Sequence, residues 1–220
     1  MNKKLFISKN ASEIEPYRSQ FEELGYSVVN HSFLSFSPVE FDIQGDYDVL
    51  FFGSLRAVIF FQAGQSISGN KLIACVGGKT AELLESLGHE VAFVGEKSGE
   101  PKVVAEEFKV WLGSRRVLFP VSDRSLRTIS RLIPADQKEE LVVYSTEVKG
   151  KAVEECDVYV FTSPSNVEGF LIENVVPKGS KVIAWGKSTE GSLVSCGITV
   201  DHCLKDSGFE GVIEILPVAF

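Results

Sequence analysis

Two glycine-containing turns hold the residues of this sequence that are best suited to bind an anion. Gly77 and Gly78 follow the apolar run Leu72–Cys75 and precede a segment of helical period that starts at Thr80. An apolar run of this kind indicates a buried parallel strand. A strand that passes through glycine into a helix leaves several backbone N–H groups without partners, and these groups form a seat for a carboxylate or a phosphate.

The same arrangement occurs again further along the chain. The apolar run Lys181–Ala184 leads through a glycine into a helical segment that starts at Thr189. The offset from Thr80 to Thr189 is 109 residues, and it holds without gaps between segments 52–99 and 161–208. A constant offset over about fifty positions indicates an internal duplication.

Strands and helices alternate in both copies, which predicts an α/β fold with two similar doubly wound parallel sheets. Ligands of such sheets lie beyond the carboxyl ends of the strands. We therefore expect the ligand to be bound by residues of the four strand-to-helix turns: Ser54, Gly78, Thr80, Thr162, Ser163, Ser165, Lys187 and Thr189. A simpler interpretation is that the turns are structural only, with glycine for the bend and threonine as the helix cap.

Two further segments carry helix signals. The segment Ser12–Gly25 is amphipathic, with Ser12 predicted as the N-cap and Glu15 as its partner in a capping box. The segment Ser122–Leu132 is predicted to form a helix that Ser122 or Asp123 caps. Each segment lies between two predicted strands, as the alternating pattern requires.

The composition argues against several classes of protein. The chain has 220 residues and a net charge of −8, whereas proteins that bind nucleic acid need basic faces. No apolar run is long enough to cross a bilayer, and the apolar stretch near the start is shorter than that of a signal peptide. The four cysteines show no C-x-x-C spacing, which is typical of reduced thiols. We therefore expect a cytoplasmic protein that binds neither nucleic acid nor a membrane.

The common catalytic and cofactor motifs do not occur. Segments 78–80 and 186–188 lack the earlier glycine of a phosphate-binding P-loop. No Ser–His–Asp or Cys–His arrangement can be read, and the run Asp201–Cys203 alternates in direction along a predicted strand, so we expect no metal site. Tyr144 ends a predicted strand just before an extended segment and is the best placed proton donor, although a packed aromatic residue with its hydroxyl at the surface is the simpler interpretation.

In order and spacing, these segments resemble the uroporphyrinogen-III synthase family over nearly the whole chain. Val76–Ala81, followed by Gly88, is similar to the family's V-G-x-x-T-A…G. Phe161–Ser165 is similar to the family's F-T-S-P-S, and Val143–Thr146 is similar to V-Y-x-T. None of these motifs is specific alone, and the resemblance depends on their order and spacing.

Two positions depart from the family's pattern. Gly53 stands where the family usually has threonine, and Trp185 stands where it prefers an aliphatic residue. These departures concern contacts at the turns rather than the fold. The resemblance implies two domains joined by two extended linkers. The first would contain residues 1–33 and 149–220, and the second residues 34–148.

The resemblance also implies a reaction. The family cyclises hydroxymethylbilane, a linear tetrapyrrole with many carboxylates, to uroporphyrinogen III. Water leaves to give an azafulvene, the far ring attacks through its substituted carbon, and a spiro intermediate rearranges so that this ring is inverted. The expected protein is therefore a lyase that needs no cofactor or metal. Tyr144 would be the catalytic residue that assists departure of the hydroxyl group, and the turns would bind the carboxylates.

Two further expectations concern partners. We expect a monomer that takes its unstable substrate from hydroxymethylbilane synthase in a transient contact. A second hypothesis from another class is a non-catalytic two-domain protein that clamps a small anionic ligand. A thermal shift with a sugar or nucleotide, and none with tetrapyrroles, would favour this second hypothesis.

Overall fold

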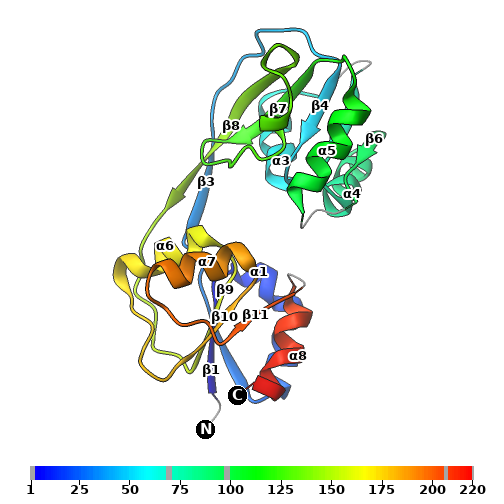
Figure 1. The fold of residues 1–220 in the computed structure, drawn as a ribbon. Helices are drawn as coiled ribbons and strands as arrows, with labels where there is room; N and C mark the ends of the chain where they lie inside the picture. Colours follow the sequence, from blue (N-terminus) through cyan, green and yellow to red (C-terminus); the bar gives the residue numbers. More distant parts are fainter. Residues whose placement is uncertain (1–2, 68–70, 97–99, 206–207, 220) are drawn as a thin grey trace. The chain divides into compact units, whose positions relative to one another are not determined.

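The computed structural model describes residues 3–67, 71–96, 100–205 and 208–219. The chain divides into two units, each with its own core. The first unit combines residues 1–35 with residues 147–220, and the second consists of residues 36–146. The chain therefore leaves the first unit once and returns to it once (Figure 1).

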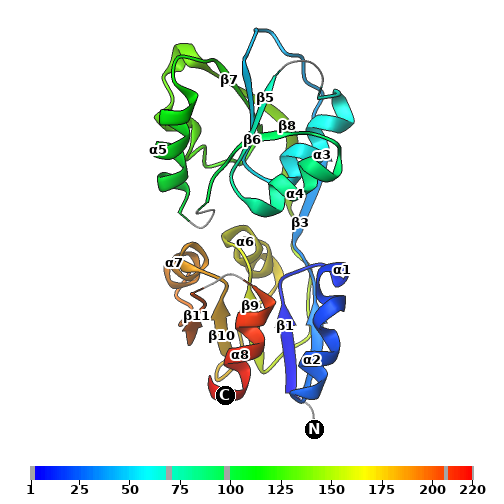
Figure 2. The same ribbon diagram turned by 90° about the vertical axis from the view of Figure 1, so that its right-hand side faces the viewer.

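The first unit is built on five parallel strands in the order β11-β10-β9-β1-β2 (Figure 2). The strands are β1 (Lys3–Ile7), β2 (Tyr26–Asn30), β9 (Val158–Phe161), β10 (Lys181–Ala184) and β11 (His202–Cys203). The helices are α1 (Ala11–Ile14), the 3-10 helix η1 (Glu15–Tyr17), α2 (Arg18–Glu23), α6 (Pro164–Glu173), α7 (Lys187–Ser195) and α8 (Phe209–Ala219). This alternation confirms the predicted α/β fold for this unit.

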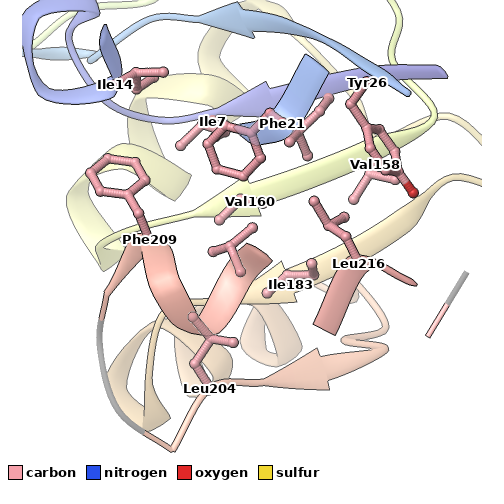
Figure 3. Packing of buried hydrophobic residues seen from close by; sticks show 12 residues of the cluster. Ile7, Ile14, Phe21, Tyr26, Val158, Val160, Ile183, Leu204, Phe209 and Leu216 are labelled. Carbon is pink, nitrogen blue, oxygen red and sulfur yellow. The ribbon is translucent and has the colours of Figure 1, made fainter. Parts of the chain in front are cut away.

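Both faces of this sheet are covered, because its central strands are apolar along their length. Leu5 and Ile7 point to one face, where Phe21 of α2 and Leu216 of α8 pack (Figure 3). Phe6 points to the opposite face, toward a cluster that includes residues of α6 and α7. These five side chains are at most 1 % exposed. Burial of each stabilises the unit by about 1.5–3 kcal/mol.

The second unit has six strands in the order β3-β8-β7-β4-β5-β6. The strands are β3 (Leu34–Pro38), β4 (Val49–Phe52), β5 (Leu72–Cys75), β6 (Val91–Val94), β7 (Val117–Ser122) and β8 (Lys138–Val148). The helices are α3 (Leu55–Gly64), α4 (Gly78–Ser86), α5 (Pro101–Leu112) and the 3-10 helices η2 (Ser130–Leu132) and η3 (Ala135–Gln137). Strands β8, β7, β4, β5 and β6 pair in parallel.

Strand β3 runs antiparallel to β8. The Val39 N–H donates to the Val143 carbonyl at 3.1 Å, and the Lys149 N–H donates to the Phe33 carbonyl at 2.9 Å. Residue numbers therefore rise along one strand as they fall along the other. The chain passes between the two units within β3 and β8, so both crossings lie in extended, hydrogen-bonded backbone.

The duplication predicted from the sequence extends to the boundaries of the elements. In the second unit, β4, α3, β5 and α4 follow one another, and in the first unit β9, α6, β10 and α7 do the same. Each first and last residue differs from its counterpart by the same offset that separates Val49 from Val158. Gly88 and Gly197 follow α4 and α7 with φ of 86° and 76°, as expected for glycines that end helices.

The segment Ser122–Leu132 does not form the predicted helix. Strand β7 includes Ser122, and after a turn only Ser130–Leu132 is helical, as a single 3-10 turn. The Asp123 carboxylate accepts the neighbouring Arg124 N–H at 2.8 Å and the distant Thr146 N–H at 2.9 Å, and Arg127 has a φ of 53°. Side chains that bond to nearby backbone compete with helix formation, and a left-handed residue interrupts it.

The first helix also begins at a different residue. Asn10 is the N-cap of α1, so the prediction of Ser12 was wrong. Glu13, rather than Glu15, accepts the backbone N–H of the cap, at 3.2 Å. The predicted single helix is divided by η1, which contains Pro16. Proline has no N–H to donate, which favours such a break.

Gly169 lies on the inward face of α6, against the start of the chain segment that leaves the first unit. A Cβ at this position would overlap Phe33 Cβ and lie 3.0 Å from Val148 Cγ1. The counterpart of Gly169 in the second unit, at the 109-residue offset, is Phe60. Glycine is therefore needed at residue 169 for close packing.

We predict that Gly169→Ala destabilises the protein by about 1–3 kcal/mol, because even one extra methyl group overpacks this contact. Gly191→Ala, in the exposed part of α7 where a Cβ meets no atom within 4 Å, should be neutral or stabilising by up to about 1 kcal/mol. Urea unfolding of both variants measures the difference. Equal stability of the two variants would contradict the packing described for Gly169.

Candidate functional site

The candidate site residues lie, in each unit, in the strand-to-helix turns at the carboxyl end of its sheet. In the second unit these are Gly53–Ser54 after β4 and Gly77–Thr80 after β5. In the first unit they are Thr162–Ser165 after β9 and Gly186–Thr189 after β10. Within each unit the two turns are neighbours, because β4 pairs with β5 and β9 pairs with β10. The sheet of the second unit therefore brings three of the predicted binding residues to one edge, and the sheet of the first unit brings the other five.

Serine caps the helix at one turn of each unit. The Ser54 side chain accepts the Ala57 N–H at 3.2 Å, and the Ser163 side chain accepts the Asn166 N–H at 3.2 Å. Both are half-buried, and capping of this kind typically contributes ~1 kcal/mol to helix stability. A hydroxyl that accepts from the backbone still carries one hydrogen that it can donate.

Glycine caps the helix at the other turn of each unit. Gly77 and Gly186 have extended backbones, with φ of 174° and 175°, and no side chain caps α4 or α7. Thr80 and Thr189 lie inside the first helical turn and are 5 % and 3 % exposed, so the interpretation of threonine as the cap was wrong. Thr80 and Thr189 donate their own N–H groups to the Gly77 and Gly186 carbonyls at 3.0 Å. The N–H groups that remain for an anion are those of the two residues before each threonine.

Lysines stand beside these helix starts. Gly78 and Lys79 begin α4, Lys187 begins α7, and all three residues are exposed. A cation at this position adds to the positive end of the helix dipole and favours a bound anion. Arg56, by contrast, lies with its guanidinium 3.9 Å from the centre of the Phe36 ring.

The Thr162 hydroxyl belongs to a group of hydrogen bonds that joins the residues directly after β1 and β9. It donates to the Ser8 carbonyl at 2.8 Å and lies 3.1 Å from the Ser8 hydroxyl, which accepts the Thr162 N–H at 2.8 Å. Ser8 is completely buried. The only hydrogen of the Thr162 hydroxyl is thus used within the protein, which leaves Ser163 and Ser165 as the freer hydroxyls at this turn.

Asn166 joins this turn to the segment that leads out of the first unit. Its side-chain carbonyl accepts the Phe33 N–H at 2.9 Å, and its amide donates to the Ser163 hydroxyl at 3.1 Å. Asn166 is 4 % exposed. A buried amide with both of its ends satisfied fixes the position of the groups it contacts.

Tyr144 lies in the middle of β8 rather than at its end. Its ring is 8 % exposed, stacks on Phe60 at 5.0 Å and meets Phe36 edge-on at 6.1 Å. The register between β7 and β8 shifts next to it, so that Ser122 pairs with Tyr144. The structure thus places Tyr144 in the core of the second unit, against Phe60 of α3.

The remaining reactive side chains do not form a second site in the described chain. No group of three or more histidine, cysteine or acidic residues is arranged to hold a metal among the described residues. Burial raises the pKa of the Cys156 thiol to about 11 and also raises the pKa of Cys75. Burial, together with nearby Lys151, lowers the pKa of His31. In the described segments no helix has the length and apolarity to cross a membrane.

Sequence reasoning missed Ser8 and Asn166. Ser8 directly follows β1, and the rule that ligands lie beyond the carboxyl ends of strands applies to it as to the other turns. Asn166 lies three residues after the predicted cap Ser163, but its partner Phe33 is 133 residues away in sequence. A contact of that range depends on the pairing of strands, which no local pattern contains.

Comparison with known proteins agrees with this architecture. The model of the family described as uroporphyrinogen-III synthase HemD matches residues 15–214. The fold is similar to that of uroporphyrinogen-III synthetase from Helicobacter pylori 26695, with a TM-score of 0.72, 18 % identity and 98 % of each chain covered. It is also similar to a mutant uroporphyrinogen III synthase from the extremely thermophilic bacterium Thermus thermophilus, with a TM-score of 0.62, 15 % identity and 96 % of each chain covered.

No curated protein matches the sequence significantly. These two solved structures share less than a fifth of their residues with this chain, so they establish the fold alone. The family match covers both units and all four strand-to-helix turns. On this ground the chain belongs to the uroporphyrinogen-III synthase HemD family.

Proposed function

We propose that the protein is a cyclising hydro-lyase that converts hydroxymethylbilane to uroporphyrinogen III. The observation that carries this proposal is the family match over residues 15–214. The strand-end turns supply the kind of binding surface that a substrate with many carboxylates needs. The product belongs to tetrapyrrole, and hence haem, biosynthesis.

The reaction depends on holding the substrate in the correct conformation more than on strong acid or base catalysis. The C–O bond of the terminal hydroxymethyl group breaks, and the hydroxyl takes up a proton and leaves as water. The far ring then attacks the resulting azafulvene through its substituted carbon and forms a spiro centre. One carbon–carbon bond of that centre breaks and re-forms at the other side, and loss of a proton completes the inverted ring. The linear substrate closes by itself to the uninverted isomer, so the protein acts mainly by orientation.

The helix starts at α4 and α7 are the proposed carboxylate seats. Their first-turn N–H groups, with Lys79 and Lys187 beside them, offer donors and positive potential in each unit. Ser54, Ser163 and Ser165 add hydroxyl donors at the neighbouring turns. Such local seats outweigh the net charge of −8, because charges separated by more than roughly 8 Å are largely screened at physiological ionic strength.

Tyr144 is the proposed donor to the departing hydroxyl group. A phenol donates a hydrogen bond at neutral pH, and the aromatic contacts with Phe36 and Phe60 hold its ring in one place. The cation left behind is stabilised by its pyrrole, so a weak acid is enough. We also propose a cytoplasmic monomer whose domains follow the boundaries implied by the resemblance, with hydroxymethylbilane synthase as a transient partner.

Isomer analysis tests the proposed function. Hydroxymethylbilane is generated in situ by its synthase, the protein is added, the products are oxidised, and the type I and type III porphyrins are separated by chromatography. We expect mainly type III in proportion to the amount of protein. Type I alone, from a sample shown to be folded, would contradict the proposal.

Removal of the Tyr144 hydroxyl should slow the reaction without unfolding the protein. We expect Tyr144→Phe to lower kcat roughly 10- to 100-fold, which is at or below the smallest rate enhancement that general acid catalysis typically contributes. The matched control is Tyr47→Phe, which removes a hydroxyl from another tyrosine packed on the same core cluster. Unchanged kcat in Tyr144→Phe would remove Tyr144 from the mechanism.

The two buried threonines should contribute a smaller, similar effect in each unit. We expect Thr80→Ala and Thr189→Ala each to lower kcat/KM about three- to tenfold, as loss of one hydrogen bond to the substrate does. Thr→Ser at the same positions keeps the hydroxyl and serves as the control. Steady-state kinetics with in situ substrate measures the effect, and equal losses in the Ala and Ser variants would argue for a packing role only.

A further inference from the structure

The second unit contains a cavity of about 250 Å³ at the carboxyl end of its sheet. Its base is formed by residues at the ends of β4, β5 and β7, among them Phe51, Gly53 and Val76. Pro101, the first residue of α5, closes one side, and segment 125–130 forms the other. The cavity lies directly beside the turns that are proposed to seat carboxylates.

The internal duplication shows why the cavity is open. At the offset of 109 residues, Trp185 corresponds to Val76 and Thr162 corresponds to Gly53. In the first unit the Trp185 ring packs edge-on against Phe209 at 5.1 Å. Small side chains in the second unit thus replace larger ones at the same two positions of a shared backbone.

The opposite wall differs between the units as well. In the first unit the strand β1 is followed by α1 and η1, and Tyr17 at the end of η1 stacks on Phe209 at 4.6 Å. In the second unit β7 is followed instead by the irregular segment 123–129, in which Arg127 has a φ of 53°. The helix that sequence analysis expected here is replaced by a chain that lines the cavity.

This segment adds polar groups to an otherwise apolar cavity. The Ser125, Arg127 and Thr128 residues line it together with Phe51 and Val76. The Arg127 Nε lies 2.5 Å from Glu140 Oε2, so the two form an ion pair, although this buried nitrogen makes no hydrogen bond of acceptable angle. A guanidinium carries five N–H donors, more than one carboxylate can use. The cavity therefore combines an apolar surface with the side chain of Arg127 and three hydroxyl-bearing residues, Ser125, Thr128 and Ser130.

We propose that this cavity receives one carboxylate-bearing pyrrole ring of the substrate. A volume of about 250 Å³ is below the ~300–1,000 Å³ of sites that enclose a whole drug-sized ligand, which suits one ring rather than a linear tetrapyrrole. The flat ring would contact the apolar base, and its carboxylates would face Arg127 and the hydroxyl groups. In the first unit, where Trp185 occupies the equivalent place, the substrate is held by the turns alone. The proposal rests on the function proposed above.

The first unit shows which substitution would fill the cavity of the second. Trp185 precedes a glycine cap whose φ and ψ, 175° and 175°, are close to the 174° and 169° of Gly77. The turn after β5 therefore accepts a tryptophan before its glycine without a change of backbone. The series Val76→Leu, Val76→Phe and Val76→Trp fills the cavity in steps. Val110→Trp, on α5 at a site that is 84 % exposed, is the control for an added indole.

We expect kcat/KM for type III product to fall as the side chain at residue 76 grows, by about tenfold or more for Val76→Trp, because a displaced ring is misoriented for closure. Val110→Trp should match the wild type, and thermal unfolding confirms that each variant is folded. If Val76→Trp does not fold, the Leu and Phe variants decide by the same trend.

The cavity assignment would be overturned if folded Val76 variants kept a kcat/KM within about twofold of the wild type, because a misplaced reacting group lowers the rate by more than that. This result would leave the proposed function standing. A wild-type protein that yields only type I product would instead overturn the proposed function, and the assignment with it. The isomer that the wild-type protein produces therefore distinguishes the two failures.

Discussion

Unpaired backbone N–H groups at the start of helices are the feature on which the proposed site depends. Parallel strands connected by helices all end at the same edge of a sheet, so every strand-to-helix turn presents such groups there. Glycine caps at α4 and α7 leave the groups uncovered by any side chain of the cap. Under the proposed function, the backbone supplies the donors for the substrate's carboxylates, so binding does not depend on an excess of basic side chains.

One backbone frame serves two different sites because duplication preserved the backbone while side chains diverged. The element boundaries from β4 to α4 recur at a constant offset from β9 to α7. At single positions of that frame, however, Gly53 has Thr162 as its counterpart, and Val76 has Trp185. In the first unit, Thr162 forms hydrogen bonds with Ser8, and the Trp185 ring packs against Phe209. In the second unit these larger residues are missing, and a cavity remains.

Local signals in the sequence were sufficient to predict the elements whose ends are marked by glycine or by a serine cap. The cap Ser163 and the glycines Gly88 and Gly197, which follow helices with positive φ, are such marked ends. The helix predicted for Ser122–Leu132 failed, since the left-handed Arg127 and the bond from Asp123 to a distant N–H are not visible as a pattern. The predicted place of Tyr144 at a strand end was also wrong, because β8 continues through it to Val148. Contacts such as that between Ser8 and Thr162 join residues 154 apart in sequence and require the fold itself.

The proposed function depends on helix starts that bind the carboxylates of a tetrapyrrole. Two-dimensional ¹⁵N NMR of the 24.1 kDa chain, titrated with uroporphyrinogen III under reducing conditions, measures this binding separately for each unit. We expect the amide signals of residues 77–80 and those of residues 186–189 to shift as the ligand is added and to reach saturation. Shifts located away from both turns would show that these helix starts do not bind the carboxylates.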